Sequence, residues 1–382
     1  MKSYLISSTK KSSGKTIIAT GISSILSRTD SLAVFKKGPD YIDPYWLSLA
    51  SKVNCYNLDF FTMSNSEIKK LYKQMSYEKN ISIIEGNKGL FDGISLDGGD
   101  SNASLAHLLK LEVILVIDCV GMTRGVAPLL KGYQEFDKKI KYKGIILNNI
   151  ANDRHENKVI NAINEFTKLK VIGSIHKNKQ LTIMEKKLGL EPVFQNPYTK
   201  NIIKNISSVI KKSVDMKYLI NKKTNNKDNK IPKVVLKKHI YSNLRIGVAF
   251  DSAFGFYYPD DINEFKRLGA KIIYFDTLKD KVLPKVDGLF IGGGFPERVA
   301  DKLTKNTRMI KSISNYIESE MPVYAECGGL MYLCNSIITK TNKFKMTGII
   351  NADIKMLDKP IGRGYVELMV TNKHPWMLNK DL

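Results

Sequence analysis

The sequence predicts an α/β protein of two domains, the first built on a P-loop and a parallel sheet. Short β-like runs alternate with helix-like segments from residue 1 to about 200, a pattern typical of parallel strands covered by helices. Gly-Lys-Thr opens the first of these helices, and a second α/β alternation begins at Leu244. At 382 residues the chain is long enough for roughly two to three domains.

Six apolar runs are the expected strands of the first domain. They are Tyr4–Ile6, Leu32–Phe35, Ile81–Ile84, Val113–Ile117, Gly144–Leu147 and Val171–Ile175. In open parallel sheets, ligands bind at the carboxyl ends of the strands. The loops after these runs are therefore where function is expected.

The first of these loops has the pattern of a phosphate-binding loop. Ser7–Thr16 reads SSTKKSSGKT and is followed by an apolar-periodic segment from Ile17. In a P-loop, backbone N–H groups and the helix N-terminus face the phosphates, the lysine reaches the terminal phosphates and the next hydroxyl binds Mg²⁺. The expected nucleotide-binding residues are Ser8, Ser13, Gly14, Lys15, Thr16 and Ile17. The usual first glycine is missing, and the alternative is a Ser/Lys-rich turn that caps a helix.

Acidic residues follow three more of the expected strands. The loop KKGPDYIDPYW (36–46) carries Asp40 and Asp43, EGNKGLFDG (85–93) carries Glu85 and Asp92, and Asp118 ends the run VILVID. A carboxylate at a strand tip beside a P-loop is well placed to hold Mg²⁺. Each acid alone could equally cap a turn or a helix. Together they indicate a site for metal, nucleotide and substrate.

Composition narrows the class of protein. The net charge is +23, but lysine is abundant throughout the chain and no aromatic residues interleave with arginines, so we expect no nucleic-acid partner. The positive charge is interpreted as a solvated surface, and an anionic small-molecule substrate is also compatible with it. No apolar run is long enough for a membrane span, so a cytoplasmic protein is expected. The four cysteines show no CxxC spacing, which argues against a zinc site. The sequence leaves open whether the protein forms a homodimer.

The second half carries a candidate nucleophile. Residues 204–243 are rich in Lys and Asn and are interpreted as a solvated linker. Further on, the apolar run Val323–Ala325 leads into Glu326-Cys327-Gly328-Gly329 and an apolar helix. A tight strand-to-helix turn exposes a nucleophile, and N–H groups of Gly328 and of the run at 292–294 could stabilise an oxyanion. The alternative is a buried structural cysteine, which is how Cys334 is interpreted.

Several motifs together resemble the cobyrinic acid a,c-diamide synthase family of glutamine-dependent amidotransferases. They are the P-loop, GPDYIDP, EGNKGLFDG, GDSNAS at 99–104, IGGGFPE and YAECGGLMYL. The resemblance implies a dethiobiotin-synthetase-type P-loop domain at 1–203, a linker at 204–243 and a class I glutaminase domain with a flavodoxin-like fold at 244–382. GPDYIDP is specific, because related cobyric acid synthases carry a KPQN-type motif in that loop.

The resemblance also implies a chemistry and the residues for it. ATP would phosphorylate a substrate carboxylate, and ammonia from glutamine would attack the acyl phosphate to form a carboxamide. Lys15 and Thr16 would bind phosphate and Mg²⁺. Asp43 and Glu85 would be further metal ligands. The residues directed toward the substrate would be Asp40, Tyr41 and Asp92. In the glutaminase half, Cys327 would form the glutamyl thioester, with Gly293 and Gly328 stabilising its oxyanion.

The chain departs from the family pattern at three places. Ser8 replaces the first P-loop glycine, and EKKLGLEP (185–192) lacks the histidine usual before LGL. The family's catalytic histidine lies in a GHEFHYS-like motif, which is not found before Leu382, and His374 in NKHPWM is interpreted as a surface-turn residue. We therefore expect a glutaminase domain that is incomplete at its C-terminus, poor use of glutamine and retained use of ammonia.

Three alternatives remain at the level of sequence. The resemblance implies amidation of the a and c acetates of cobyrinic acid; the alternative within the family is a,c-diamidation of nickel sirohydrochlorin, because the two substrates share the peripheral acetates. A P-loop ATPase that switches partners would need neither GPDYIDP nor a nucleophile elbow. The third alternative is a degenerate paralogue, non-catalytic or able to use only ammonia, or a fragment of a split gene.

Overall fold

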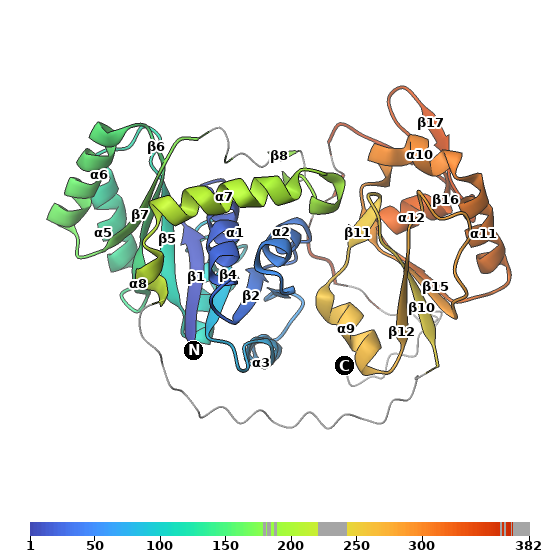
Figure 1. The fold of residues 1–382 in the computed structure, drawn as a ribbon, viewed down its shortest axis with the longest axis horizontal. Helices are drawn as coiled ribbons and strands as arrows, with labels where there is room; N and C mark the ends of the chain where they lie inside the picture. The colour runs from blue at the N-terminus through green and yellow to red at the C-terminus, as the bar shows by residue number, and fades with distance from the viewer. Residues whose placement is uncertain are drawn as a thin grey trace.

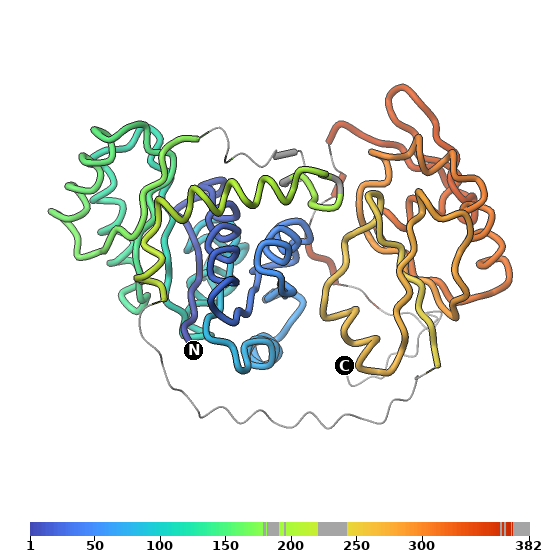
Figure 2. Tube along the Cα trace, in the orientation of Figure 1, coloured from blue at the N-terminus to red at the C-terminus, as the bar shows by residue number. Residues whose placement is uncertain are grey.

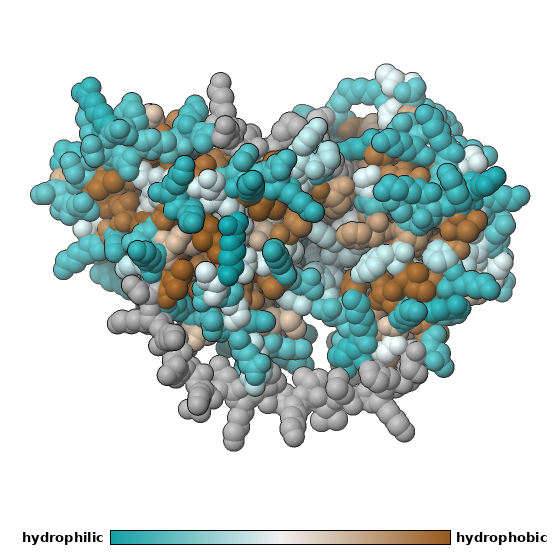
Figure 3. Space-filling model, in the orientation of Figure 1, coloured by the Kyte–Doolittle hydropathy of each residue, from teal (hydrophilic) through white to brown (hydrophobic). Residues whose placement is uncertain are grey.

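The computed structural model describes residues 1–178, 181, 185–186, 189–220, 243–359, 361–362, 364–367 and 369. It has two α/β parts, drawn blue to green and yellow to red in Figure 1. Within the described residues, no helix has the length and apolar character needed to cross a bilayer. Polar side chains cover most of the visible face, and the apolar patches between them are small and separate (Figure 3).

The first domain is built on a seven-stranded sheet in the order β3-β2-β4-β1-β5-β6-β7, with every pair of neighbours parallel. The strands are β1 Lys2–Ser8, β2 Leu32–Lys37, β3 Cys55–Leu58, β4 Ile81–Glu85, β5 Glu112–Asp118, β6 Lys141–Ile150 and β7 Val171–His176. All six expected strands are confirmed. The additional strand, β3, has the sequence CYNL, which is too short and too mixed to be found by apolar runs alone.

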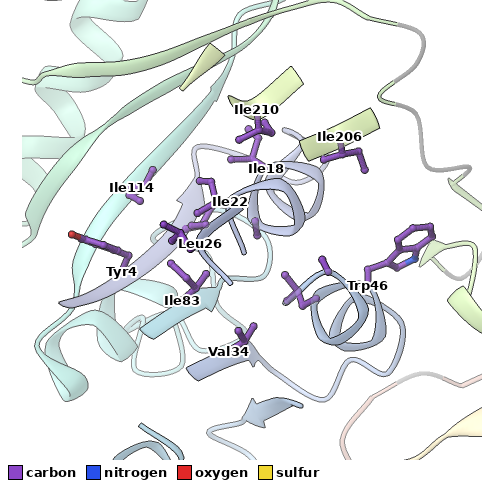
Figure 4. Packing of buried hydrophobic residues seen from close by; sticks show 14 of the residues in the cluster. Tyr4, Ile18, Ile22, Leu26, Val34, Trp46, Ile83, Ile114, Ile206 and Ile210 are labelled. Carbon is purple, nitrogen blue, oxygen red and sulfur yellow. The ribbon is translucent and has the colours of Figure 1, made fainter. Parts of the chain in front are cut away.

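Helices cover both faces of this sheet. They are α1 Lys15–Leu26, α2 Ile42–Ser51, α3 Asn65–Met75, α4 Asn102–Leu109, α5 Val126–Phe136, α6 Asp153–Phe166, α7 Thr199–Ser213 and α8 Met216–Ile220. One core lies between the sheet and α1, α2 and α7, and the other lies under α3 to α6. Ile18 and Ile22 of α1 point into the first core beside Ile206 and Ile210 of α7 (Figure 4). Gly21 lets α7 approach, because a Cβ there would lie 2.4 Å from Ile210.

The expected boundary between domain and linker falls inside a helix. Helix α7 runs through residue 204 to Ser213 and crosses the first domain over α1 (Figure 2), and α8 continues to Ile220. Its apolar face buries Ile203, Ile206 and Ile210. Residues 204–220 therefore pack on the first domain, and 221–242 lie outside the described residues.

The second domain has a four-stranded parallel sheet in the order β12-β10-β13-β15. Its strands are β10 Arg245–Ala249, β12 Lys271–Phe275, β13 Gly288–Ile291 and β15 Val323–Ala325. Smaller sheets are formed by β11 Phe254–Phe256 with β14 Gly293–Gly294, and by β16 Cys334–Ile338, β17 Lys343–Lys345 and β18 Ile350–Lys355. In the first domain, β8 Glu185–Lys186 and β9 Gly189–Leu190 form a short hairpin.

The described part of the second domain also contains the α-helices α9 Pro259–Arg267, α10 Ala300–Lys305, α11 Thr307–Glu318 and α12 Gly328–Leu333. The helical stretch from Ala300 to Glu318 is divided into two helices at Asn306. The Asn306 side chain donates hydrogen bonds to the carbonyl oxygens of Thr277 and Asp280, both at 2.8 Å. This buried anchor explains the break, because it holds the chain where the helix would otherwise continue.

The two domains contact each other through aromatic residues. The ring of Tyr41, just before α2, stacks on Tyr258 with ring centroids 4.3 Å apart and on Phe256 at 5.4 Å. The Tyr258 hydroxyl donates to the carbonyl oxygen of Pro39 at 3.2 Å. The carboxyl end of β2 thus faces the second domain.

Candidate active site

The loop between β1 and α1 has the backbone of an anion-binding turn. Ser12 has φ of +58° and Gly14 has φ of +91°, a left-handed conformation that favours glycine. A Cβ at Gly14 would lie 2.3 Å from Nδ2 of Asn148, so the contact also requires glycine. Helix α1 has no acidic residue in its first turn. Its N-terminal N–H groups are thus suited to an anion.

Ser8 and Lys15 are linked within this loop. The Lys15 ammonium donates to Oγ of Ser8 at 2.8 Å, and Ser8 in turn donates to the carbonyl oxygen of Lys10 at 2.7 Å. Burial and the nearby Lys36 lower the pKa of Lys15 to about 8. The serine that replaces the usual glycine therefore positions the lysine. Ser13 donates to the same Lys10 oxygen at 2.9 Å.

Four side chains converge beside the P-loop, and we call them the carboxylate centre: Thr16, Lys36, Asp43 and Glu85. Thr16 Oγ1 donates to Oε1 of Glu85 at 2.6 Å and lies 3.4 Å from Oδ2 of Asp43. The Lys36 ammonium lies 2.6 Å from Oδ2 of Asp43 and 3.1 Å from Oε1 of Glu85. Lys36 and Glu85 are register partners at the ends of β2 and β4, while Asp43 comes from the first turn of α2.

Burial governs the charges of this centre. Burial raises the pKa of Glu85, which is fully buried. Burial acts in the same direction on Asp43, but the adjacent Lys36 ammonium outweighs it and holds the pKa of Asp43 below its usual value. The two carboxylates likewise keep the pKa of Lys36 above its usual value despite burial. The centre therefore holds charged groups out of water because they pair with each other.

The same oxygens fit a magnesium ion. Oε2 of Glu85 is buried and has no hydrogen-bond partner within the described residues. Together with Thr16 Oγ1 and the Asp43 carboxylate it forms a set of hard oxygen donors next to a phosphate loop, which is the chemistry that Mg²⁺ prefers.

The other predicted acids have different surroundings. Asp40 Oδ1 accepts hydrogen bonds from the N–H groups of Ile42 at 2.7 Å and Asp43 at 3.2 Å, so it caps the start of α2. Burial and the Asp43 charge raise the pKa of Asp40 to about 7. Asp92 is exposed, and its carboxylate accepts from the N–H of Gly89 at 2.9 Å. Asp118 pairs with Lys10 at 2.9 Å, outside the carboxylate centre.

Two asparagines and a lysine were missed by the sequence reasoning. Lys36 was treated as part of a loop, yet it is 3% exposed and sits between the carboxylates. Asn57 donates to the carbonyl oxygens of Gly38 at 2.8 Å and Asp40 at 2.7 Å, which fixes the loop after β2. Asn102, in GDSNAS, donates to the carbonyl oxygens of Asn87 and Gly89 and accepts from the N–H of Asn87, which fixes the loop after β4. Only Asn57, in CYNLDF, stood out as a polar residue amid mainly apolar sequence, because Lys36 is followed by a second lysine and Asn102 lies in the polar run GDSNAS.

Cys327 occupies the expected turn between β15 and α12. Its backbone has φ of +50° and ψ of −112°, which is strained for a residue with a side chain, and the residue is exposed. A Cβ built on Gly293 would lie 3.4 Å from the Cys327 Cβ, so the predicted oxyanion residues Gly293 and Gly328 both border the cysteine. Cys334 is buried, as expected for a structural cysteine. His374 lies outside the described residues.

A cavity of about 960 Å³ is lined by residues of both halves, and we call it the shared cavity. On the first domain it is lined by residues of the P-loop and of the carboxylate centre, with Asp40 and Tyr41. On the second domain it is lined by Phe256, Gly293, Gly294, Phe295, Glu326 and Cys327. Ser8, Asp92 and Gly328 are not among the lining residues. The ring of Tyr41 is engaged in the interdomain stack, so it borders the cavity from the interface.

Comparisons with known proteins identify both halves. Residues 245–377 match the family described as CobB/CobQ-like glutamine amidotransferase domain, and residues 39–185 match an AAA domain family. The cobyrinate a,c-diamide synthase of Magnetococcus marinus is 38% identical, covering 97% of this chain and 81% of that protein. The protein of that name from Picrophilus torridus is 39% identical, covering 93% of this chain and 81% of that protein. The one from Methanococcus vannielii is 37% identical, covering 96% of this chain and 82% of that protein. The chain therefore belongs to the cobyrinate a,c-diamide synthase family.

Proposed function

We propose that this protein is an ATP-dependent ligase that converts the a and c acetate carboxylates of cobyrinic acid to carboxamides, with glutamine or ammonia as nitrogen donor. The observation that carries the proposal is the shared cavity, which is bordered by a phosphate loop and a carboxylate centre on one side and by an exposed cysteine in a nucleophile turn on the other. The names of the relatives supply the substrate.

The synthetase half would activate the carboxylate. One carboxylate oxygen attacks the γ-phosphorus of ATP, the bond to the β,γ-bridging oxygen breaks, and ADP leaves. The N-terminus of α1 and the ammonium of Lys15 hold the phosphates and stabilise the charge that develops on them. Thr16, Asp43 and Glu85 would hold Mg²⁺, which neutralises phosphate charge when bound. The acyl phosphate makes the carboxylate oxygen a good leaving group.

The glutaminase half would supply the nitrogen. The Cys327 thiol gives up its proton and its sulfur attacks the side-chain carbonyl carbon of glutamine; a proton reaches the leaving nitrogen so that ammonia departs, and water later hydrolyses the glutamyl thioester to glutamate and the free thiol. Backbone N–H groups of Gly293 and Gly328 would stabilise the oxyanion. Ammonia then attacks the acyl carbon, and inorganic phosphate leaves with the original carboxylate oxygen. Because both sites border one cavity, ammonia released at Cys327 would enter the space that the synthetase residues also line.

Product mass after incubation with ATP, Mg²⁺ and cobyrinic acid tests this proposal. We expect two carboxylates to become carboxamides with ammonia as donor. The Lys15→Met variant should lose this activity, whereas Cys327→Ala should keep the reaction with ammonia and lose any reaction with glutamine. Amidation that proceeds without ATP, or that survives Lys15→Met at the wild-type rate, would overturn the proposal. A parallel incubation with nickel sirohydrochlorin compares the two substrates.

A further inference from the structure

Two consecutive lysines end strand β2, and their side chains lie on opposite faces of the sheet. Val34 belongs to the core under α1 and α2, and Phe35 to the core under α3 and α4. By strand alternation Lys36 shares the face of Val34, and Lys37 shares the face of Phe35. Lys36 accordingly meets the carboxylate centre, whereas Lys37 lies 5.8 Å from the ring centroid of Phe60 on the other face.

Lys37 is a buried cation without a carboxylate partner in the described part of the chain. The residue is 5% exposed, and its single described hydrogen bond runs to Oδ1 of Asn87 at 3.1 Å. Within the described residues, no carboxylate oxygen lies within 4.0 Å of its ammonium, whereas Lys36 has three such neighbours. An ammonium has three N–H donors, so two of them are available to a ligand.

The charges around Lys37 do not neutralise it. Burial lowers the pKa of Lys37 to about 8, Asp100 and Asp59 oppose that effect from a distance, and Lys88 and Lys36 add to it. The Asp100 carboxylate is engaged by backbone N–H groups of its own loop, and Asp59 by neighbouring residues and a tyrosine hydroxyl. An unpaired buried ammonium is unfavourable by itself, and an anionic ligand would remove that penalty.

Lys37 is accessible from the shared cavity. It lines the cavity together with Pro39, Asn87 and Lys88. The phosphate loop and Lys15 belong to the α1 side of the sheet, where the nucleotide phosphates are expected. An anion bound to Lys37 would therefore lie in the shared cavity beside the phosphates, on the opposite face of the sheet from α1.

We propose that Lys37 binds a carboxylate of the acidic substrate and holds it beside the carboxylate centre, so that it determines affinity for the substrate and not for the nucleotide. Asn87 orients the ammonium, and the contact is a charge-assisted hydrogen bond. The inference rests on the proposed function for the identity of the substrate. Loss of one hydrogen bond to a charged group corresponds to a decrease in affinity of about 10- to 100-fold.

The test is direct binding of cobyrinic acid to the full chain, measured by equilibrium dialysis without turnover, for wild type, Lys37→Met and Lys37→Arg. We expect Lys37→Met to weaken binding of cobyrinic acid by about 10- to 100-fold and Lys37→Arg to restore part of it. The Kd for ATP should stay within about twofold of wild type, because neither variant changes the phosphate loop. Lys37→Gln serves as the second uncharged variant if the methionine variant is unstable.

Lys2→Met is the matched control. Lys2 is also a partly buried lysine with a lowered pKa, but it begins β1 at the amino end of the sheet and donates to backbone carbonyls there. Unchanged cobyrinic acid binding in Lys37→Met and Lys37→Gln would overturn the inference. An equal loss of ATP affinity would overturn it as well, because Lys37 would then be a phosphate ligand. Wild type that binds cobyrinic acid without amidating it would contradict the proposed function alone, and wild type that fails to bind it would overturn both.

Discussion

Replacing Lys36 by methionine should destabilise the first domain strongly. The lysine side chain is 4% exposed and lies between Asp43, 14% exposed, and Glu85, which is fully buried. Lys36→Met preserves the volume of the side chain but leaves two carboxylates without their cation. The variant therefore isolates the electrostatic role of the ammonium from its packing.

The magnitude follows from the burial of the pair. Removing one partner of a buried ion pair raises the free energy of the folded state by about 3 to 5 kcal/mol, because the remaining charge stays desolvated. For a domain of this size, 1 kcal/mol corresponds to about 2 to 4 °C in Tm. We therefore expect the Tm of the first domain to fall by about 6 to 20 °C.

Thermal unfolding followed by circular dichroism measures this shift. Lys69→Met, on the exposed face of α3, is the control for losing a lysine and should change stability by no more than about 0.5 kcal/mol. Adding Glu85→Gln to Lys36→Met should recover part of the loss, because it removes one of the unpaired charges. Mg²⁺ should raise the Tm of Lys36→Met more than that of wild type. A Tm for Lys36→Met within about 2 °C of wild type would refute the reasoning that the ammonium neutralises a buried carboxylate pair.

Three further predictions concern other positions. Burial raises the pKa of Asp40 to about 7, so the folded chain holds a proton that the unfolded chain releases near 3.8. The resulting contribution to stability is present below about pH 4 and is lost as the pH rises through 7. Asp40→Asn should therefore flatten that part of a curve of Tm against pH. Cys327→Gly should relieve the backbone strain at φ of +50° and raise the Tm, whereas Cys327→Ala should leave the strain in place and not raise the Tm. Both variants should lose the reaction with glutamine. An equal Tm for the two variants would count against backbone strain at this position. Asn102→Ala should lower the free energy of unfolding in urea by about 1 to 3 kcal/mol, because it leaves buried carbonyl groups of the loop after β4 unpaired; a change below about 0.5 kcal/mol would contradict this role.

The sheet of the first domain was predictable because its strands are buried on both faces. Such strands read as continuous apolar runs, and six of the seven were found in that way. β3 escaped because a four-residue edge strand with an asparagine has no such run. The predicted linker begins too early, because it was placed by its lysine content and not by the apolar face of α7. The spacing of Ile203, Ile206 and Ile210 does predict a helix.

The candidate site was predictable only in part, because its geometry depends on contacts distant in sequence. Thr16, Asp43 and Glu85 could be grouped, since each follows a strand end of one parallel sheet. Nothing in KKGPD distinguishes Lys36 from Lys37, because their environments are set by side chains on opposite faces. Tyr41 shows the same limit, because its stacking partners come from the other domain.

Transfer of ¹⁸O tests most directly whether ATP activates the substrate carboxylate in the shared cavity. Cobyrinic acid labelled with ¹⁸O in its acetate carboxylates is incubated with the protein, ATP, Mg²⁺ and ammonia, and the inorganic phosphate is analysed by mass spectrometry. An acyl-phosphate route predicts one ¹⁸O atom in the phosphate for each carboxamide formed. Carboxamide formation with unlabelled phosphate would contradict the proposed mechanism.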